Sequence, residues 1–460
     1  MSKRNVYGAL AVATMVGAMT CAPMRAQEVS GLQRLYDLAD AHSQQIKVSE
    51  AALKAAEEGV AAAKSAMLPS VELGLQGSYT GNAMLLSRGF STSGTTEYIV
   101  PGLGPQQVAN GKQPTPHWGN SFTAQVQQVV YAGGAIRTGI KMSELGLQLA
   151  ELDVEKNRQE VRFLLTGYYL DLCKLENQLE VIKSNITLTR KVIEQMKARR
   201  EQGTALKNDI TRYELQLQNL ELTRVKLLDA SSIIRHQMAN TLHLPDSVVI
   251  NPDRQALDED IMALQTIDAQ ESWQEKAADS NVGLRQALLA KELAGQKAKA
   301  ARAASLPSVA LVVENHLNGP YTQDLIPRDA NVNVWFIGIG VKYSLSSLWK
   351  NNHSIRKAKH EAVQSHEQWQ LAGENVENGV QANYVDFLTA QMEVRTQQKQ
   401  VELAEQNYSV VQNRYDNDLA LLTDMLDASN MKLSAEMALV NARITLLYNF
   451  YKLKYITSSL

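Results

Sequence analysis

The sequence has 460 residues, of which 45% are hydrophobic and 20% charged, and its formal net charge is −2. A charge balance so close to neutral excludes the basic surface of a nucleic-acid-binding protein, so we expect no nucleic acid among the partners. Aromatic residues make up only 6% of the chain, while Ala, Leu and Gln dominate the middle of each half, as is typical of helical bundles.

The N-terminal residues 1–26 have the pattern of a secretory signal peptide. Lys3 and Arg4 precede a stretch of small and apolar residues that ends at a plausible cleavage site. Attachment of a lipid at Cys21 is the alternative. After cleavage only Cys173 would remain, so we expect no disulfide within one chain. No run of roughly 18 apolar residues follows, so we expect no membrane-spanning helix.

The first half of the mature chain, residues 27–244, alternates between helical and strand patterns. Its first helix is rich in Ala, a strong helix former, and we expect a break in it near Ser43. Pro69 ends this helix, because proline lacks the backbone N–H that a helix interior requires. In chain order we predict a helix, a strand, a long loop, a second strand and two long helices joined by a turn near Gly203, at residues 31–67, 71–79, 80–120, 121–131, 135–200 and 206–244.

Residues 245–268 are a predicted linker, and the second half, residues 269–460, repeats the order of the first. The helix-to-strand junction Leu68-Pro69-Ser70-Val71 returns as Leu306-Pro307-Ser308-Val309. The predicted elements here are a helix, two strands and two long helices joined by a turn near Asp418, at residues 270–305, 309–317, 333–343, 352–415 and beyond 419. A long repeat of mixed helix and strand indicates an internal duplication.

The lengths of these elements predict an oligomer in a membrane. A helix of roughly 65 residues is about 100 Å long and must pack along other long helices. Strands of about nine or ten residues can cross a bilayer when tilted, but four of them are too few to close a barrel. Three chains would supply twelve strands. We therefore predict a mainly α fold with a small β part: a long α-helical coiled-coil barrel, with four membrane strands per chain that complete a 12-stranded β-barrel as a trimer. The alternative is a soluble four-stranded sheet packed on helices.

The order of these motifs resembles the TolC family of outer-membrane efflux channels. The resemblance rests on the repeated junction, on the strand end Val130-Tyr131-Ala132-Gly133-Gly134, on the segment from Arg199 to Asp209, and on Arg414-Tyr415 followed by Asp424-Met425-Leu426-Asp427-Ala428. It covers essentially the whole mature chain. It implies a homotrimer in the outer membrane that extends into the periplasm, with residues 245–268 in a belt around its middle. Its partners would be outer-membrane lipid, a periplasmic adaptor protein and an inner-membrane pump.

The resemblance also implies roles for residues near the two helix turns. Asp424 and Asp427 match acidic residues that ring a periplasmic constriction, and Tyr415 and Asp209 match residues of its gate. The alternative is that the aspartates only cap a helix. Where the family pattern has an arginine this chain has Ala420, so the salt bridge of the gate is in question. Arg200 and Arg212 are the alternative partners. The helix-tip residues that would contact an adaptor are Gly203, Thr204, Asp418 and Leu419, and the strand-start motif comprises Leu68, Pro69, Leu306 and Pro307.

The sequence contains no arrangement of residues typical of catalysis. His360-Glu361 is not followed by a second histidine at the spacing of a zinc peptidase helix, so we expect no enzyme, no metal and no cofactor. The predicted function is a passive export duct of a tripartite efflux system, gated at the periplasmic helix tips. A duct for type I protein secretion is one alternative, and a secreted or periplasmic coiled-coil scaffold is another. Tyr79, Trp118 and Trp335 are candidates for aromatic girdles at the membrane interfaces, with ordinary packing as the alternative.

Overall fold

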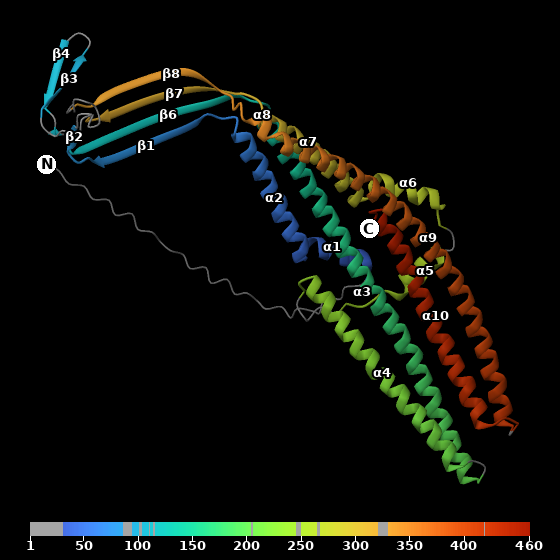
Figure 1. The fold of residues 1–460 in the computed structure, drawn as a ribbon. Coiled ribbons are helices and arrows are strands. Elements are labelled where there is room, and N and C mark those ends of the chain that lie inside the picture. Colours follow the sequence, from blue (N-terminus) through green and yellow to red (C-terminus); the bar gives the residue numbers. More distant parts are fainter. Residues whose placement is uncertain are drawn as a thin grey trace, which may run out of the picture.

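The chain is an elongated molecule with a β-sheet at one end and long helices at the other (Figure 1). The computed structural model describes residues 31–85, 94–100, 104–109, 111–113, 116–203, 206–244, 250–264, 267–320, 330–417 and 419–460. The predicted signal peptide with Cys21, and the predicted tip residues Thr204 and Asp418, lie outside this part.

The helices of the two halves match in length, as an internal duplication requires. In the first half they are α1 (Leu32–His42), α2 (Gln44–Ser65), α3 (Ala135–Glu201) and α4 (Lys207–Thr241). In the second half they are α6 (Gln270–Ser280), α7 (Val282–Ala303), α8 (Ser347–Lys350), α9 (Asn352–Asp416) and α10 (Leu422–Ile456), with α5 (Arg254–Ala263) between the halves. Both short helices have 11 residues, both second helices 22 and both last helices 35, while α3 has 67 and α9 has 65.

A single non-helical residue breaks the first helix of each half. Ser43 and Asn281 have ψ angles of 127° and 116°, which are far from helical values. The Oδ1 atom of Asn281 accepts a hydrogen bond from the backbone N–H of Leu284 at 2.8 Å and so caps α7. The predicted break near Ser43 is confirmed, and its repeat at Asn281 lies at the same offset as the two Leu-Pro-Ser-Val junctions, since 281 − 43 and 306 − 68 are both 238.

The four predicted strands form one antiparallel sheet in the order β1 (Ser70–Tyr79), β6 (Trp118–Ala132), β7 (Ser308–Gly319) and β8 (Val332–Lys342). The segment between β1 and β6, expected to be a loop, contains short strands instead: β2 (Ala83–Leu85) pairs with β5 (Gly111–Gln113), and β3 (Thr95–Val100) pairs with β4 (Gly104–Ala109). The Gly and Pro residues of this segment obscured the β-branched residues of β3, which favour a strand.

The long helices form a layer whose outer members lie on the same two sides as the outer strands. Near the sheet, α2 packs on α3, α3 on α7, and α7 on α9; farther away, α4 packs on α3, α3 on α10, and α10 on α9. Figure 1 shows α4 continuing the line of α2 and α10 that of α7. The place where α10 meets α7 is hydrogen-bonded, because Nδ2 of Asn281 donates to the carbonyl of Ile456 at 2.8 Å. One side of the chain therefore ends in β1, α2 and α4, and the other in β8 and α9.

The main hydrophobic core lies where the short helices meet this layer. Its fully buried members include Leu35 of α1, Leu165 of α3, Met238 of α4, Phe387 of α9 and Leu447 of α10. Trp273 of α6 joins it edge-on to Phe450, with ring centroids 6.3 Å apart. No helix in the described part of the chain is both long and apolar enough to cross a bilayer.

Candidate functional site

The four-stranded sheet has one apolar and one polar face. Cross-strand pairs place Val71 beside Val126, Val126 beside Val313, and Val313 beside Ile337, so these side chains share a face. Leu75 and Ile339 on that face are 84% and 75% exposed. An apolar surface of this extent is unstable in water and needs an apolar environment.

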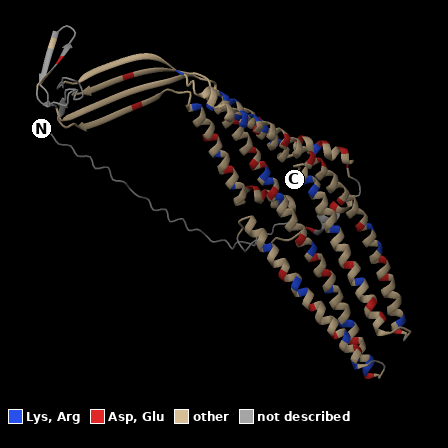
Figure 2. Cartoon of the chain, viewed as in Figure 1, with Lys and Arg blue, Asp and Glu red and all other residues tan. Residues whose placement is uncertain are grey.

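The opposite face of the sheet is polar. It carries Glu72, Gln76, Thr123, Glu314 and Asn318, which alternate along the strands with the apolar residues. The main contacts of every helix in the described chain are with other helices, and the sheet extends beyond them (Figure 1). The alternative of a soluble sheet packed on helices is therefore wrong. Figure 2 shows that charged residues are sparse on the sheet and frequent on the helices.

Aromatic side chains occur at both ends of the apolar band. At the end far from the helices, Tyr79 packs edge-on against Trp118 with ring centroids 5.1 Å apart, and Trp335 is 68% exposed. At the end near the helices, Tyr131 and Tyr343 are exposed. Two aromatic belts that flank an apolar band are typical of strands that cross a membrane.

The strand-start motif marks a tight crossing of backbones. Leu68-Pro69 and Leu306-Pro307 follow the ends of α2 and α7 and open β1 and β7. Gly133, at the end of β6, has a φ of 62°, and a Cβ atom there would lie 2.6 Å from the carbonyl oxygen of Ala303. Only glycine fits this position, so it holds the second helix-to-strand junction against the start of α3.

The two helix turns far from the sheet begin their second helices in the same way. In the first turn Gly203 has a φ of 80°, and the backbone N–H of Leu206 donates to Oδ2 of Asp209 at 3.3 Å. In the second, the N–H of Leu421 donates to Oδ2 of Asp424 at 3.0 Å. Both aspartates are thus helix caps, which places a negative charge at a helix N-terminus.

Asp427 lies one turn beyond Asp424 on the same face of α10. Both side chains are exposed. Within the described residues Asp427 forms no hydrogen bond or ion pair, so its carboxylate is available for contacts outside the chain. No group of three or more possible metal ligands occurs in the described part of the chain.

A small core joins the two helical hairpins, α3–α4 and α9–α10, near their tips. It comprises Val192, Ile193, Met196, Ile210, Tyr213, Tyr408, Leu422, Met425 and Ala428, with Tyr415 partly buried at its edge. Burial raises the pKa of the Tyr213 hydroxyl, and the neighbouring Tyr408 and Tyr415 raise it further. Burial likewise raises the pKa of Tyr415, although Arg199 acts against this. The hydroxyls of this core therefore remain neutral at physiological pH.

Arg199, at the end of α3, makes a direct polar contact between the two hairpins. Its Nη2 atom lies 3.3 Å from both Oδ1 and the carbonyl oxygen of Asp416 at the end of α9. Its guanidinium also lies 5.2 Å from the ring centroid of Tyr415, within reach of a cation–π interaction. The side chain is 28% exposed, which reduces screening by solvent.

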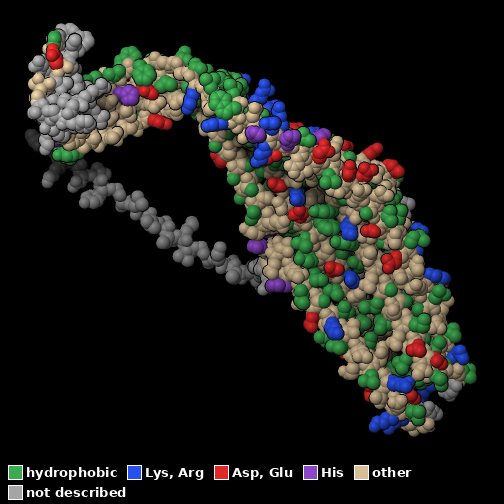
Figure 3. Space-filling view, in the orientation of Figure 1, with side chains coloured by type: hydrophobic (Ala, Val, Ile, Leu, Met, Phe, Trp, Pro, Cys, Tyr) green, Lys and Arg blue, Asp and Glu red, His purple; other side chains and the backbone are tan. Residues whose placement is uncertain are grey.

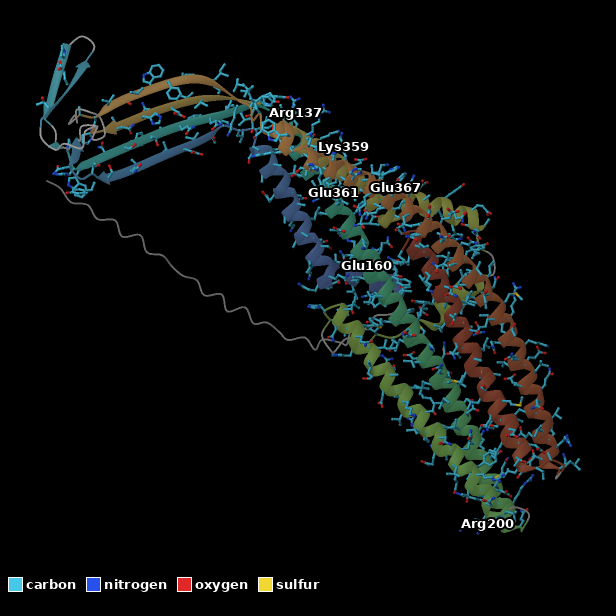
Figure 4. All side chains as sticks on the ribbon, in the orientation of Figure 1. Arg137, Glu160, Arg200, Lys359, Glu361 and Glu367 are labelled. Carbon is cyan, nitrogen blue, oxygen red and sulfur yellow. The ribbon has the colours of Figure 1, made fainter. Side chains whose placement is uncertain are left out.

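Among the sequence-predicted gate residues, the structure brings Tyr415 and Asp209 close enough for the charge of Asp209 to act on the Tyr415 hydroxyl. The turn at Ala420 and Leu419 is held by Arg414, whose Nη2 donates to the Leu419 carbonyl at 3.3 Å. The sequence pointed to Arg200 and Arg212 as substitutes for the missing arginine, whereas the arginine that bonds to the other hairpin at the tips is Arg199. One signal in the sequence pointed to Arg199: it occupies the position in the first half that Arg414 occupies in the second. Figure 4 shows Arg200 at the end of the first hairpin.

Comparison with known proteins identifies the family. The family described as "Outer membrane efflux protein" matches residues 35–235 and 273–457, one block in each half of the duplication. The chain belongs to this family.

Several relatives have the same architecture at low sequence identity. TolC of Salmonella enteritidis is 21% identical over 442 residues, which cover 94% of this chain and 83% of that protein. The outer membrane protein VceC of Vibrio cholerae superposes with a TM-score of 0.72 at 18% identity, over 93% of this chain and 96% of that one. The MtrE channel of Neisseria gonorrhoeae, solved in its open state, gives a TM-score of 0.71 at 15% identity, over 93% and 88% of the two chains.

This outer membrane efflux protein is therefore a channel of the outer membrane that extends into the periplasm. It is a passive duct and not an enzyme. Membership confirms the resemblance to the TolC family and sets aside a secreted scaffold. Channels of this family are trimeric and work with adaptor and pump partners.

Proposed function

We propose that three copies of this chain close into one export duct, which receives cargo from an inner-membrane pump through a periplasmic adaptor. The supporting observation is the alignment of the open edges. Within the described residues, β1 and β8 each leave one side of the sheet without a partner strand, and α2, α4 and α9 leave the helical layer open on the same two sides. An open sheet edge is not tolerated in lipid, and a head-to-tail contact between these edges forms a ring. Twelve strands would close the barrel.

The gate of this duct lies at the helix tips farthest from the sheet. Asp424 and Asp427 of three copies would place six carboxylates at the narrowest point, where such rings favour cations. Arg199 would hold the two hairpins of each chain together through Asp416 and Tyr415. The turns that contain Gly203, Thr204, Asp418 and Leu419 would contact the adaptor, since they join the helices at the end of the chain farthest from the sheet (Figure 1).

Replacement of the unpaired carboxylate tests this proposal. The purified protein should run as a trimer in native mass spectrometry and form channels in a planar bilayer. Asp427→Asn should raise the single-channel conductance and weaken cation selectivity, because it removes three charges from the ring but no helix cap. Asp229→Asn, an exposed position on α4, is the matched control and should change neither quantity. A monomer would refute the proposed assembly, and equal conductance in the two variants would refute the proposed gate.

A further inference from the structure

A band of positive charge surrounds the junction between the sheet and the helices. Four segments meet there: residues 59–71, 133–143, 293–313 and 342–360. They contain one, two, three and five Lys or Arg residues, respectively, and no Asp or Glu. We call these basic residues the basic collar. The whole chain has a net charge of −2, yet all charged residues of these four segments at the junction of sheet and helices are positive.

The side chains of the basic collar are exposed and mostly unpaired. All of them are exposed in the single chain. Lys141 pairs with Glu144 at 3.6 Å and Lys357 with Glu361 at 3.5 Å, each one turn farther along its helix. The other members, among them Arg137 on α3, form no ion pair within the described residues. Most of this charge is therefore not neutralised by the chain itself. Figure 4 shows Arg137 and Lys359 at the sheet end of the helices.

The collar directly adjoins the apolar face of the sheet. Val341 of that face is followed by Lys342, the first collar residue of its segment, and by the exposed Tyr343. The short helix α8 then presents Leu348 and Trp349, which are 53% and 62% exposed, next to Lys350. Figure 3 shows basic side chains gathered where the sheet meets the helices. Aromatic and basic residues side by side at the end of an apolar band are typical of the layer where a membrane meets water.

Acids of an adjacent copy do not account for this charge. The open edge that would meet β8 and α9 is that of β1 and α2. The last turns of α2 contribute Lys64 to the collar and no acid after Glu58, and the one acid of β1, Glu72, lies on the polar face of the sheet. Closing a trimer therefore brings collar residues near other collar residues. Like charges gathered at one level repel one another, and an anionic partner relieves this repulsion.

We propose that the basic collar binds the phosphate headgroups of anionic phospholipids in the periplasmic leaflet of the membrane. The inference rests on the proposed function for the orientation of the sheet, which places the helix end of the apolar band at that leaflet. An anionic phospholipid matches both surfaces of the protein. Its acyl chains lie against the apolar face, and its anionic headgroup lies against the collar. Each Lys or Arg near an anionic surface contributes about fivefold to affinity.

Three collar residues on one inner helix provide the test variant. Lys297, Lys299 and Arg302 lie in the last turns of α7, away from the open edges of the chain. The variant K297Q/K299Q/R302Q keeps helix propensity, because glutamine is a helix former comparable to lysine. The control K183Q/K191Q/K226Q removes three exposed lysines from the tip half of the helices.

The measurement is lipid competition on the purified trimer in detergent, read by native mass spectrometry with phosphatidylglycerol and phosphatidylcholine of the same acyl chains. The wild type should retain phosphatidylglycerol at least tenfold over phosphatidylcholine, and salt should reduce this preference. The α7 variant should lower the ratio at least fivefold and the control should leave it unchanged.

Equal retention of the two lipids by the wild type would overturn the proposal, as would a ratio that the α7 variant does not lower. A change of ion selectivity in the α7 variant with an unchanged lipid ratio would place these charges in the pore, which also overturns it. Because the lipid ratio is measured in detergent, it does not depend on conductance. A trimer that conducts but shows no lipid preference therefore refutes the collar alone, whereas failure to conduct counts against the proposed function.

Discussion

At the scale of single residues, Arg199 makes a polar contact between the two hairpins of one chain at their tips. It reaches Asp416 at 3.3 Å and covers the ring of Tyr415. Removing the guanidinium leaves Asp416 without its partner and uncovers the tyrosine. We expect Arg199→Gln to raise the single-channel conductance severalfold, because the hairpins then lose this contact at their tips and keep only the packing and polar contacts farther along the helices.

Lys197 offers a matched control for this change. It pairs with Glu214 at 3.6 Å, but both residues belong to the first hairpin. Lys197→Gln should therefore leave the conductance unchanged. An equal increase in the two variants would mean that general loss of positive charge at the tip, and not the contact between hairpins, controls the current.

We expect Tyr213 to make the tip sensitive to alkaline pH. Its hydroxyl is buried and has no hydrogen-bond partner in the described chain, and burial raises its pKa. A raised pKa stabilises the folded state fully below the unfolded value of about 10 and progressively less as the pH rises beyond it. Hydrogen exchange in the first turns of α4 should thus accelerate above about pH 10, and less so in Tyr213→Phe.

The same substitution should be neutral or slightly stabilising at pH 8, because removing a hydroxyl that lacks a partner costs no hydrogen bond. The thermal unfolding midpoint at pH 8 provides this check. A marked loss of stability there would show that the Tyr213 hydroxyl is bonded in solution.

At the scale of elements, the sheet depends on the alternation of its side chains. Leu75 lies in the middle of β1 on the apolar face, and Gln76 follows it on the polar face. Arginine on the lipid side near the bilayer midplane costs about 2–4 kcal/mol. Leu75→Arg should therefore strongly reduce the amount of protein in the outer-membrane fraction, whereas Gln76→Arg should insert normally. Equal insertion of the two would contradict the assigned faces.

The elements differ in how far the sequence could predict them. The long helices and the four strands could be predicted from the spacing of apolar residues and from the repeated Leu68-Pro69 and Leu306-Pro307 junctions, because these signals are local. The pairs β2–β5 and β3–β4 were missed, since Gly and Pro dominate the composition of that segment. Arg199 was missed for another reason. Spacing along one helix gives the face of a residue, but the partner on another hairpin depends on how the two hairpins pack.

At the scale of the whole molecule, two kinds of helix run side by side. α3 and α9 are continuous from the sheet to the tips, whereas the lines of α2 and α4, and of α7 and α10, are each interrupted. The interruption between α7 and α10 is bridged by the hydrogen bond from Asn281 to Ile456. Movement of the tip halves relative to the sheet halves then needs to bend only α3 and α9. The main core at the level of these interruptions resists such bending.

Arg199 and Asp416 belong to the same chain, so each copy in a trimer can release its own pair of hairpins without the other two. A contact between copies would break around the whole ring together, whereas this one breaks in one copy at a time. With the proposed gate, we therefore expect the pore to open stepwise, so that its current passes through discrete intermediate levels, one for each released chain, before the pore reaches full width.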